Sequence, residues 1–129
     1  MKDRYLFRGK RIDTGEWVIG NIISAPDGRQ AISEIGGNWE LYTCFPETIC
    51  QCTGLRDKNG KPIYEDDILS GYLDDDFPDD ETRTRVVWHE NGWCTNQPGC
   101  ADFEELDDWD SEHFEVIGNV VDNPELLEV

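Results

Sequence analysis

Long apolar runs and basic residues are both scarce in this 129-residue sequence. No stretch approaches the ~18 consecutive apolar residues of a membrane-spanning helix, and Tyr5, Leu6 and Phe7 are too few for a secretory signal. We therefore expect the chain to stay in the cytoplasm. Lys and Arg number 11 against 29 Asp and Glu, which gives a formal net charge of −18 at pH 7. Because nucleic acids and anionic membranes attract basic surfaces, we expect neither direct nucleic-acid binding nor membrane binding.

Recognisable catalytic motifs are also missing. The chain has no Gly-x-Ser-x-Gly elbow, phosphate-binding glycine loop or His-Glu-x-x-His pair, and its only two histidines are His89 and His113. Cys94 and His89 can be paired across a predicted hairpin as nucleophile and base, but neighbouring strands always allow such pairs. The sequence therefore predicts a protein that is not an enzyme and needs no cofactor.

Turn-forming residues recur at short intervals, and the segments between them are rich in β-branched and aromatic side chains. Five of these segments are predicted strands: residues 17–23, 47–55, 68–73, 83–88 and 114–121. Short strands separated by such turns indicate an all-β fold of small twisted sheets, arranged as a barrel or a sandwich. The length predicts a single domain over residues 1–129.

Three glycines predict local backbone features. Asn91-Gly92 lies between Trp88 and Trp93, which favours a hairpin with these two residues at the centre of a type I′ turn. Gly60, in Asp57-Lys58-Asn59-Gly60-Lys61, is expected in a left-handed conformation that closes a hairpin between residues 51–55 and 62–64. Gly118 interrupts an apolar strand, which is typical of a bulge or a close backbone approach.

Helix is predicted only near the C-terminus. Residues 102–109 are compatible with one or two turns that place Phe103 and Leu106 on one face. Asn123 followed by Pro124 has the pattern of an N-cap and a first helical residue, and opens a short turn that continues through Leu127.

Three blocks of sequence together match one known family. The first contains Arg8-Gly9-Lys10-Arg11 and residues 15–21, the second runs from Pro46 to Ile68 around the Asp57–Lys61 turn, and the third covers residues 114–127. In this order they resemble the YopX family of phage and prophage proteins. The resemblance implies an all-β fold and a phage or prophage origin, and it implies no particular activity or catalytic residue. The chain departs from the family pattern at Cys50, Cys52 and Asp66, where a small residue, Tyr and Gly are usual.

Four of the five cysteines predict a candidate metal site. Cys50 and Cys52 share one face of a predicted strand, while Cys94 and Cys100 flank a Gln97-Pro98-Gly99 turn. Four thiolates suit tetrahedral zinc, but neither pair has the usual Cys-x₂₋₄-Cys spacing. Reduced thiols packed as small apolar side chains explain the same residues. Since the family pattern has other residues at positions 50 and 52, a metal site would be peculiar to this chain.

Two acidic runs, residues 74–81 and 104–112, lie between the blocks that match the family. The first is predicted to be an exposed loop. The second, with two tryptophans, gives the predicted partner-binding set: Trp39, Glu104, Glu105, Asp107, Asp108, Trp109 and Asp110. We expect an accessory protein that binds a protein partner with a basic surface. The alternatives are a small-ligand or metal-binding domain, an acidic mimic of nucleic acid, and a charge that serves solubility alone. Exposed sheet edges also make a homo-oligomer compatible with the sequence.

Overall fold

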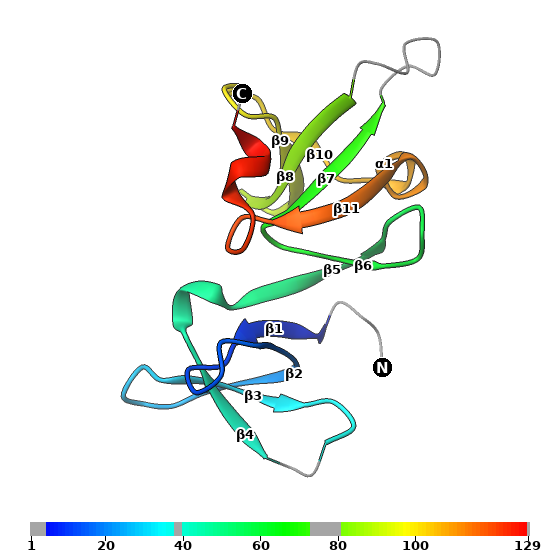
Figure 1. Cartoon of the computed structure of the whole chain (residues 1–129). Helices are drawn as coiled ribbons and strands as arrows, with labels where there is room; N and C mark the ends of the chain where they lie inside the picture. Colours follow the sequence, from blue (N-terminus) through cyan, green and yellow to red (C-terminus); the bar gives the residue numbers. More distant parts are fainter. Residues whose placement is uncertain (1–4, 38–39, 73–80, 129) are drawn as a thin grey trace. The chain divides into compact units, whose positions relative to one another are not determined.

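The computed structural model describes residues 5–37, 40–72 and 81–128. The chain divides into two compact units, Met1–Cys52 and Thr53–Val129, and both are built from antiparallel strands (Figure 1). The described residues form two open antiparallel sheets and one short α-helix, which confirms the all-β prediction. Neither sheet closes into a barrel within these residues. That residues 1–129 make up one domain stays a prediction.

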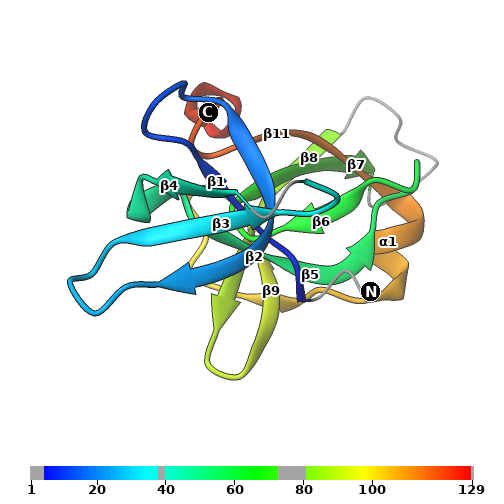
Figure 2. The ribbon, with the colours of Figure 1, turned by 90° about the horizontal axis from the view of Figure 1, so that it is seen from below.

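The first unit is a meander of short strands. Its elements are β1 (Phe7–Lys10), β2 (Trp17–Ser24), β3 (Gln30–Glu34), β4 (Leu41–Cys44), the 3-10 helix η2 (Pro46–Thr48) and β5 (Cys50–Arg56), which runs on into the second unit. β1, β2 and β3 each pair with the next strand in the chain, and β1 also pairs with the start of β5 (Figure 2). Val18, Ile32 and Cys44 form the core of this unit.

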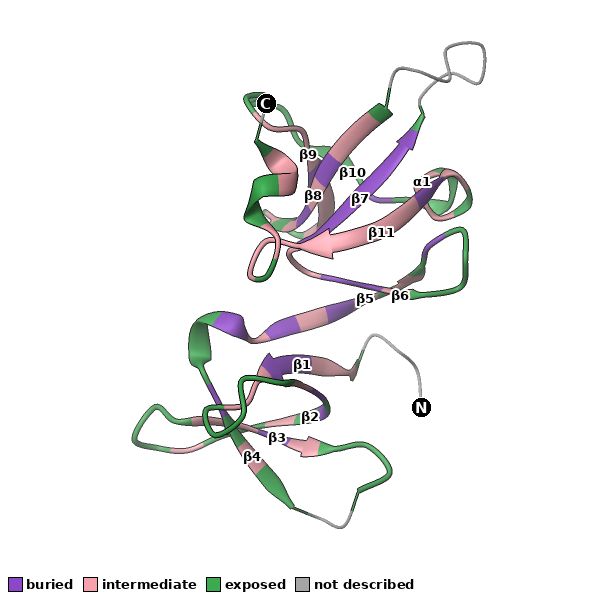
Figure 3. Ribbon diagram, viewed as in Figure 1, coloured by how far each residue is buried: buried purple, intermediate pink, exposed green. Residues whose placement is uncertain are grey.

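The second unit contains the second sheet. Its elements are the end of β5, β6 (Pro62–Tyr64), β7 (Asp67–Tyr72), β8 (Glu81–His89), β9 (Gly92–Asn96), β10 (Glu104–Glu105), the helix α1 (Asp108–His113), β11 (Phe114–Asn119) and the 3-10 helix η3 (Pro124–Leu127). The order in the sheet is β10-β9-β8-β7-β11. β7 is buried over nearly all its length (Figure 3). The core consists of Ile63, Leu69, Val86, Leu106 and Phe114.

Four of the five predicted strands are confirmed, as β2, β7, β8 and β11, with small shifts at their ends. The fifth prediction, residues 47–55, is correct only from Cys50 onward, because η2 precedes the strand. Pro46 occupies the first position of η2, and the Thr48 hydroxyl donates to the carbonyl of Phe45 at 2.7 Å and accepts from the Lys10 amide at 2.9 Å. These contacts hold the turn and delay the start of β5.

The helix predicted over residues 102–109 is wrong for residues 102–107. Glu104 and Glu105 extend as β10 beside β9, and the helix α1 starts only at Asp108. Asp107 sets this start, because its side chain accepts from the amides of Trp109 and Asp110, while Asp110 accepts from the Asp107 amide. The second helical prediction is confirmed by η3, although Asn123 does not cap it and instead accepts from the Asn119 amide at 3.3 Å. No helix among the described residues is long and apolar enough to span a membrane.

The predicted turns have mixed outcomes. Gly60 has φ 83°, as expected, and the register of β11 shifts between Val116 and Gly118, which confirms the bulge. The turn proposed at Asn91-Gly92 is displaced by one residue. Gly92 pairs with His89 inside the ladder, so the two loop residues are Glu90 and Asn91, and of these only Glu90 has a positive φ, at 59°. Apart from Glu81, which begins β8, the predicted acidic loop 74–81 lies outside the described residues.

Candidate binding site

The core-side face of the second sheet changes from apolar to polar along β8 and β9. Val86 is fully buried in the core, and Thr84, two residues earlier, lies on the same face. The register places Thr95 opposite Val86, and Glu104 opposite Thr95. Hydroxyl and carboxylate groups therefore continue a row of side chains that begins in the hydrophobic core.

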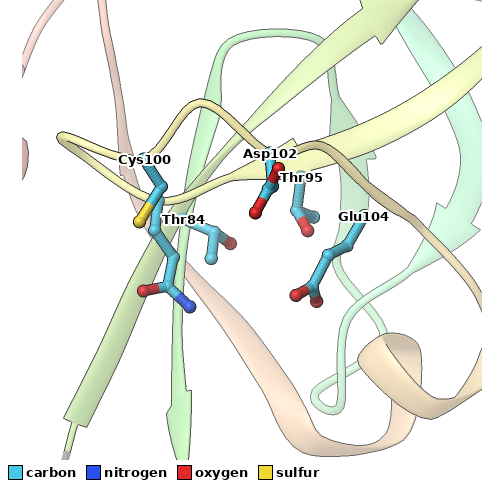
Figure 4. Close-up of a pocket in the computed structure, with 6 residues that line it drawn as sticks. Thr84, Thr95, Cys100, Asp102 and Glu104 are labelled. Atoms are coloured by element: carbon cyan, nitrogen blue, oxygen red, sulfur yellow. The ribbon is translucent and has the colours of Figure 1, made fainter.

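A small cavity of about 90 Å³ lies at this polar end of the sheet. We call it the polar cavity, and it is lined by Thr84, Thr95, Gln97, Cys100, Asp102 and Glu104. Figure 4 shows the carboxylates of Asp102 and Glu104 on one side of Thr84, with the sulfur of Cys100 turned away from them. Asp102 and Glu104 are exposed, so the acidic groups of the cavity are accessible to solvent.

Thr84 is the most unusual member of the polar cavity. Only 6% of its surface is exposed, and its hydroxyl oxygen is buried without a hydrogen-bond partner among the described residues. Folded proteins pair nearly all buried polar groups, since an unpaired one costs about 1–3 kcal/mol. The hydroxyl of Thr84 is therefore an unused hydrogen-bonding group at the base of an acidic cavity.

The loop between β9 and β10 positions Asp102. The side-chain amide of Asn96 donates to the carbonyls of Cys100 at 3.0 Å and Asp102 at 2.9 Å, and the Cys100 amide donates to the Gln97 carbonyl at 3.1 Å. These bonds fasten the loop through its backbone and use none of its acidic side chains. Within the described chain, the carboxylates of Asp102 and Glu104 have no hydrogen bond or ion pair.

The predicted partner-binding residues have different surroundings. Glu104 faces the polar cavity, whereas Glu105 lies on the opposite face of β10 and lines a larger cavity with His89 and Phe103. Trp109 is 41% exposed, and its ring stacks on His113 with centroids 4.2 Å apart. Asp108 is an exposed residue of the first turn of α1, and Trp39 lies outside the described residues.

Asp107 and Asp110 already serve the fold, because they form the capping box of α1. Burial, more than the neighbouring charges of Asp107 and Glu104, raises the pKa of Asp110 above its usual value. The two residues are consequently less available to a partner than Asp102 and Glu104, whose carboxylates make no such bonds.

The cysteines are all free thiols. Cys50 and Cys52 are buried on β5 in the first unit, as alternation predicts, while Cys94 and Cys100 belong to the second unit and Cys100 lines the polar cavity. No group of three or more His, Cys, Asp or Glu side chains in the described ranges is placed to hold a metal ion. The four-cysteine zinc site stays a prediction.

The surroundings of Cys94 and His89 do not activate a nucleophile. Burial, followed by the charges of Glu105 and Glu90, raises the pKa of the Cys94 thiol, which disfavours the reactive thiolate. The His89 ring stacks on Phe103, with a centroid distance of 3.9 Å and an interplanar angle of 3°.

Comparison with known proteins supports the resemblance seen in the three sequence blocks. The family model described as YopX protein matches residues 7–128. The chain belongs to the YopX family. Among solved structures, this YopX chain is similar to the crystal structure of protein EF1440 from Enterococcus faecalis. The TM-score is 0.57 and the identity 24%, over 95% of this chain and 96% of that one. The likeness concerns the fold. No curated protein matches the chain.

Sequence reasoning on this YopX chain singled out two members of the polar cavity, Glu104 through the density of acidic residues and Cys100 as a candidate zinc ligand. It missed Thr84, Thr95 and Asp102. The available signal was the alternation in Thr84-Arg85-Val86, which places a hydroxyl on the face that carries a buried valine.

Proposed function

We propose that this YopX-family chain is a phage- or prophage-encoded accessory protein of the bacterial cytoplasm that catalyses no reaction and binds a protein partner with a basic surface. The observation that carries this proposal is the polar cavity, where the unpaired carboxylates of Asp102 and Glu104 adjoin the unpaired hydroxyl of Thr84. The phage setting and the cytoplasmic location rest on the family resemblance and on the apolar pattern of the sequence.

Electrostatics favours a basic partner. The chain carries a net charge of −18, and residues 104–112, whose first residue lines the polar cavity, concentrate acidic groups. A surface of this kind attracts positive groups and accelerates their encounter at low ionic strength. Specificity then comes from groups that lack partners in the free protein and gain them in the complex.

Affinity capture with the full chain tests the proposal. The tagged protein is incubated with host lysate at low salt, and the retained proteins are compared among the parent, Asp102→Asn/Glu104→Gln and a control, Asp108→Asn/Glu112→Gln. The control removes the same charge from the nearby acidic run 104–112 at two residues that do not line the cavity. We expect a defined protein with a basic surface that the cavity variant loses and the control retains, and that salt elutes.

Two outcomes of this capture would contradict the proposal: retention of no protein at low salt, or equal losses in both variants. The capture also examines the nucleic-acid mimic. If the retained protein binds DNA and duplex DNA displaces it from the chain, the carboxylates stand in for phosphates.

A second candidate function is small-ligand binding at the larger cavity of the second unit. Its volume, about 560 Å³, falls within the range of about 300–1,000 Å³ that is typical of ligand pockets. Leu55, Trp93 and Leu106 supply apolar walls, and the stacked pair of His89 and Phe103 supplies a flat one. Screening metabolites by tryptophan fluorescence would reveal a ligand, and its loss in Phe103→Ala with retention in Glu104→Gln would assign it to this cavity.

A further inference from the structure

We infer that the polar cavity is the receptor for one arginine side chain of the partner, whose guanidinium group enters between Asp102, Glu104 and the two threonines. This inference rests on the proposed function and names the chemical group that the site recognises. It is carried by the composition of the cavity together with the buried, unpaired hydroxyl of Thr84.

The groups that line the cavity are suited to accept hydrogen bonds. The two carboxylates accept only, and the hydroxyls of Thr84 and Thr95 have free acceptor capacity. A guanidinium group carries five N–H donors in a plane, accepts none and keeps its charge at every physiological pH. It can therefore satisfy two carboxylates and a recessed hydroxyl at the same time, which the compact ammonium of lysine, with three donors, does less completely.

The position of Thr84 explains why this hydroxyl stays unpaired in the free protein. Its strand neighbour on the same face, Val86, belongs to the apolar core, and Leu69 lies opposite it on β7. These two apolar neighbours offer no polar group, so a partner for the hydroxyl has to come from the side of the cavity. A cavity of about 90 Å³ holds several waters or one planar head group.

Nuclear magnetic resonance on the full chain tests the inference with small probes. The amides of Thr84, Thr95 and Asn96 are followed during titration with N-acetyl-arginine amide, with the neutral citrulline counterpart, with N-acetyl-lysine amide and with calcium chloride. We expect saturable shifts at these amides with the arginine probe at concentrations on the order of millimolar, as suits a fragment. The lysine probe should bind several-fold more weakly, and the citrulline probe should leave these amides unchanged.

Variants assign the effect to individual groups. Thr84→Val removes the hydroxyl and preserves shape and charge. We expect it to lower the affinity for the arginine probe about tenfold, which is equivalent to one charge-assisted hydrogen bond. Glu104→Gln should lower the affinity for the arginine probe by at least as much. Glu105→Gln is the matched control, since it removes the same charge from the next residue on the opposite face of β10, and it should change the affinity less than twofold.

The outcomes separate this inference from the proposed function. Equal binding of the arginine and citrulline probes, equal effects of Glu104→Gln and Glu105→Gln, or stoichiometric shifts with calcium alone would each overturn the arginine receptor. A lysate partner that is lost in Asp102→Asn/Glu104→Gln but retained in full by Thr84→Val would uphold the proposed function and refute the receptor. Binding of the arginine probe with no retained partner would do the reverse.

Discussion

Asp66 shows how one residue reconciles this chain with its family pattern. It has φ 68°, a left-handed conformation in which a side chain is strained and glycine, the residue that the resemblance to the family implies here, is not. Its backbone is fixed because its amide donates to the Val86 carbonyl and its carbonyl accepts from the Val120 amide, both at 2.8 Å. The carboxylate gains an ion pair with Arg85, 2.8 Å from Nη2. Asp66 thus lacks the backbone freedom of glycine but gains an ion pair with Arg85 on β8.

Substitutions at Asp66 separate these two effects. Both Asp66→Gly and Asp66→Ala lose the ion pair, but only alanine keeps the strain of the positive φ. We therefore expect the glycine variant to exceed the alanine variant in free energy of unfolding by about 1 kcal/mol in urea titrations. At Lys58, whose φ is not positive, the same comparison should favour alanine. Equal stability of the two Asp66 variants would show that the position carries no strain.

At the scale of elements, Asp57 fastens the β5–β6 turn to β11. One carboxylate oxygen accepts from the amides of Asn59 and Lys61, each at 2.9 Å, and the other accepts from the Val116 amide at 2.9 Å. The Lys58 amide adds a bond to the Phe114 carbonyl at 3.0 Å. The Asp57–Lys61 motif is therefore more than a turn signal, because its first residue joins segments almost sixty positions apart.

Replacing Asp57 tests this connection. Asp57→Ala leaves three backbone donors without their acceptor, and the free energy of unfolding should fall by about 2–4 kcal/mol in urea titrations. Asp57→Asn keeps one acceptor oxygen for the turn and should lose less. Hydrogen exchange gives a more local measurement, since the amide of Val116 should lose protection in both variants while Val18 in the first unit is unaffected. A stable Asp57→Ala variant would show that the turn and β11 do not depend on this carboxylate.

The start of α1 gives a pH dependence with a definite sign. Burial raises the pKa of Asp110 in the folded chain above its unfolded value, so the native state binds the proton more tightly. The contribution of this group to stability therefore increases as pH falls through the raised pKa. Asp110→Asn imitates the protonated side chain and keeps an acceptor for the Asp107 amide. We expect this variant to be more stable than the parent at pH 7, with a difference that shrinks as the pH is lowered toward the ordinary carboxyl range.

Thermal unfolding of both proteins, measured in steps of about one pH unit between about pH 4 and pH 7, gives this difference. Asp108→Asn, on the exposed side of the same turn, is the charge-matched control and should show no such convergence. A parent protein that is more stable than Asp110→Asn at pH 7 would mean that the charged capping box outweighs the cost of burial.

For the whole molecule, the net charge of −18 predicts a marked response to salt. Like charges repel one another more strongly in the compact state than in the unfolded chain. Raising sodium chloride from about 0.01 M to about 1 M shortens the screening length from roughly 30 Å to 3 Å, and should raise the thermal midpoint. Potassium chloride should act equally, because screening does not depend on the identity of the ion. A midpoint that falls with either salt would show that attractive ion pairs dominate the surface.

The sequence predicts the molecule best where a segment carries its own signal. β2, β7, β8 and β11 are runs of β-branched and aromatic residues, and all four are predicted. β1 and β4, with the sequences Phe-Arg-Gly-Lys and Leu-Tyr-Thr-Cys, are too short and mixed to show a pattern, and they become strands because neighbours supply their hydrogen bonds. The polar cavity is harder still to predict, since it depends on the register that places Thr95 beside Glu104. The acidic run identified Glu104, but no local rule indicates Thr84.

The unpaired hydroxyl of Thr84 lowers the stability of the fold, whereas in the proposed arginine receptor the same hydroxyl serves recognition. A valine of the same shape has no hydroxyl to leave unpaired, so Thr84→Val should raise the free energy of unfolding by about 1 kcal/mol. Thr82 is half-buried on the same strand, and Thr82→Val is the control that should change the free energy of unfolding little. Selection for stability alone would therefore remove this hydroxyl. If the polar cavity receives an arginine side chain as proposed, a relative without that partner would be free to drift toward valine at this position.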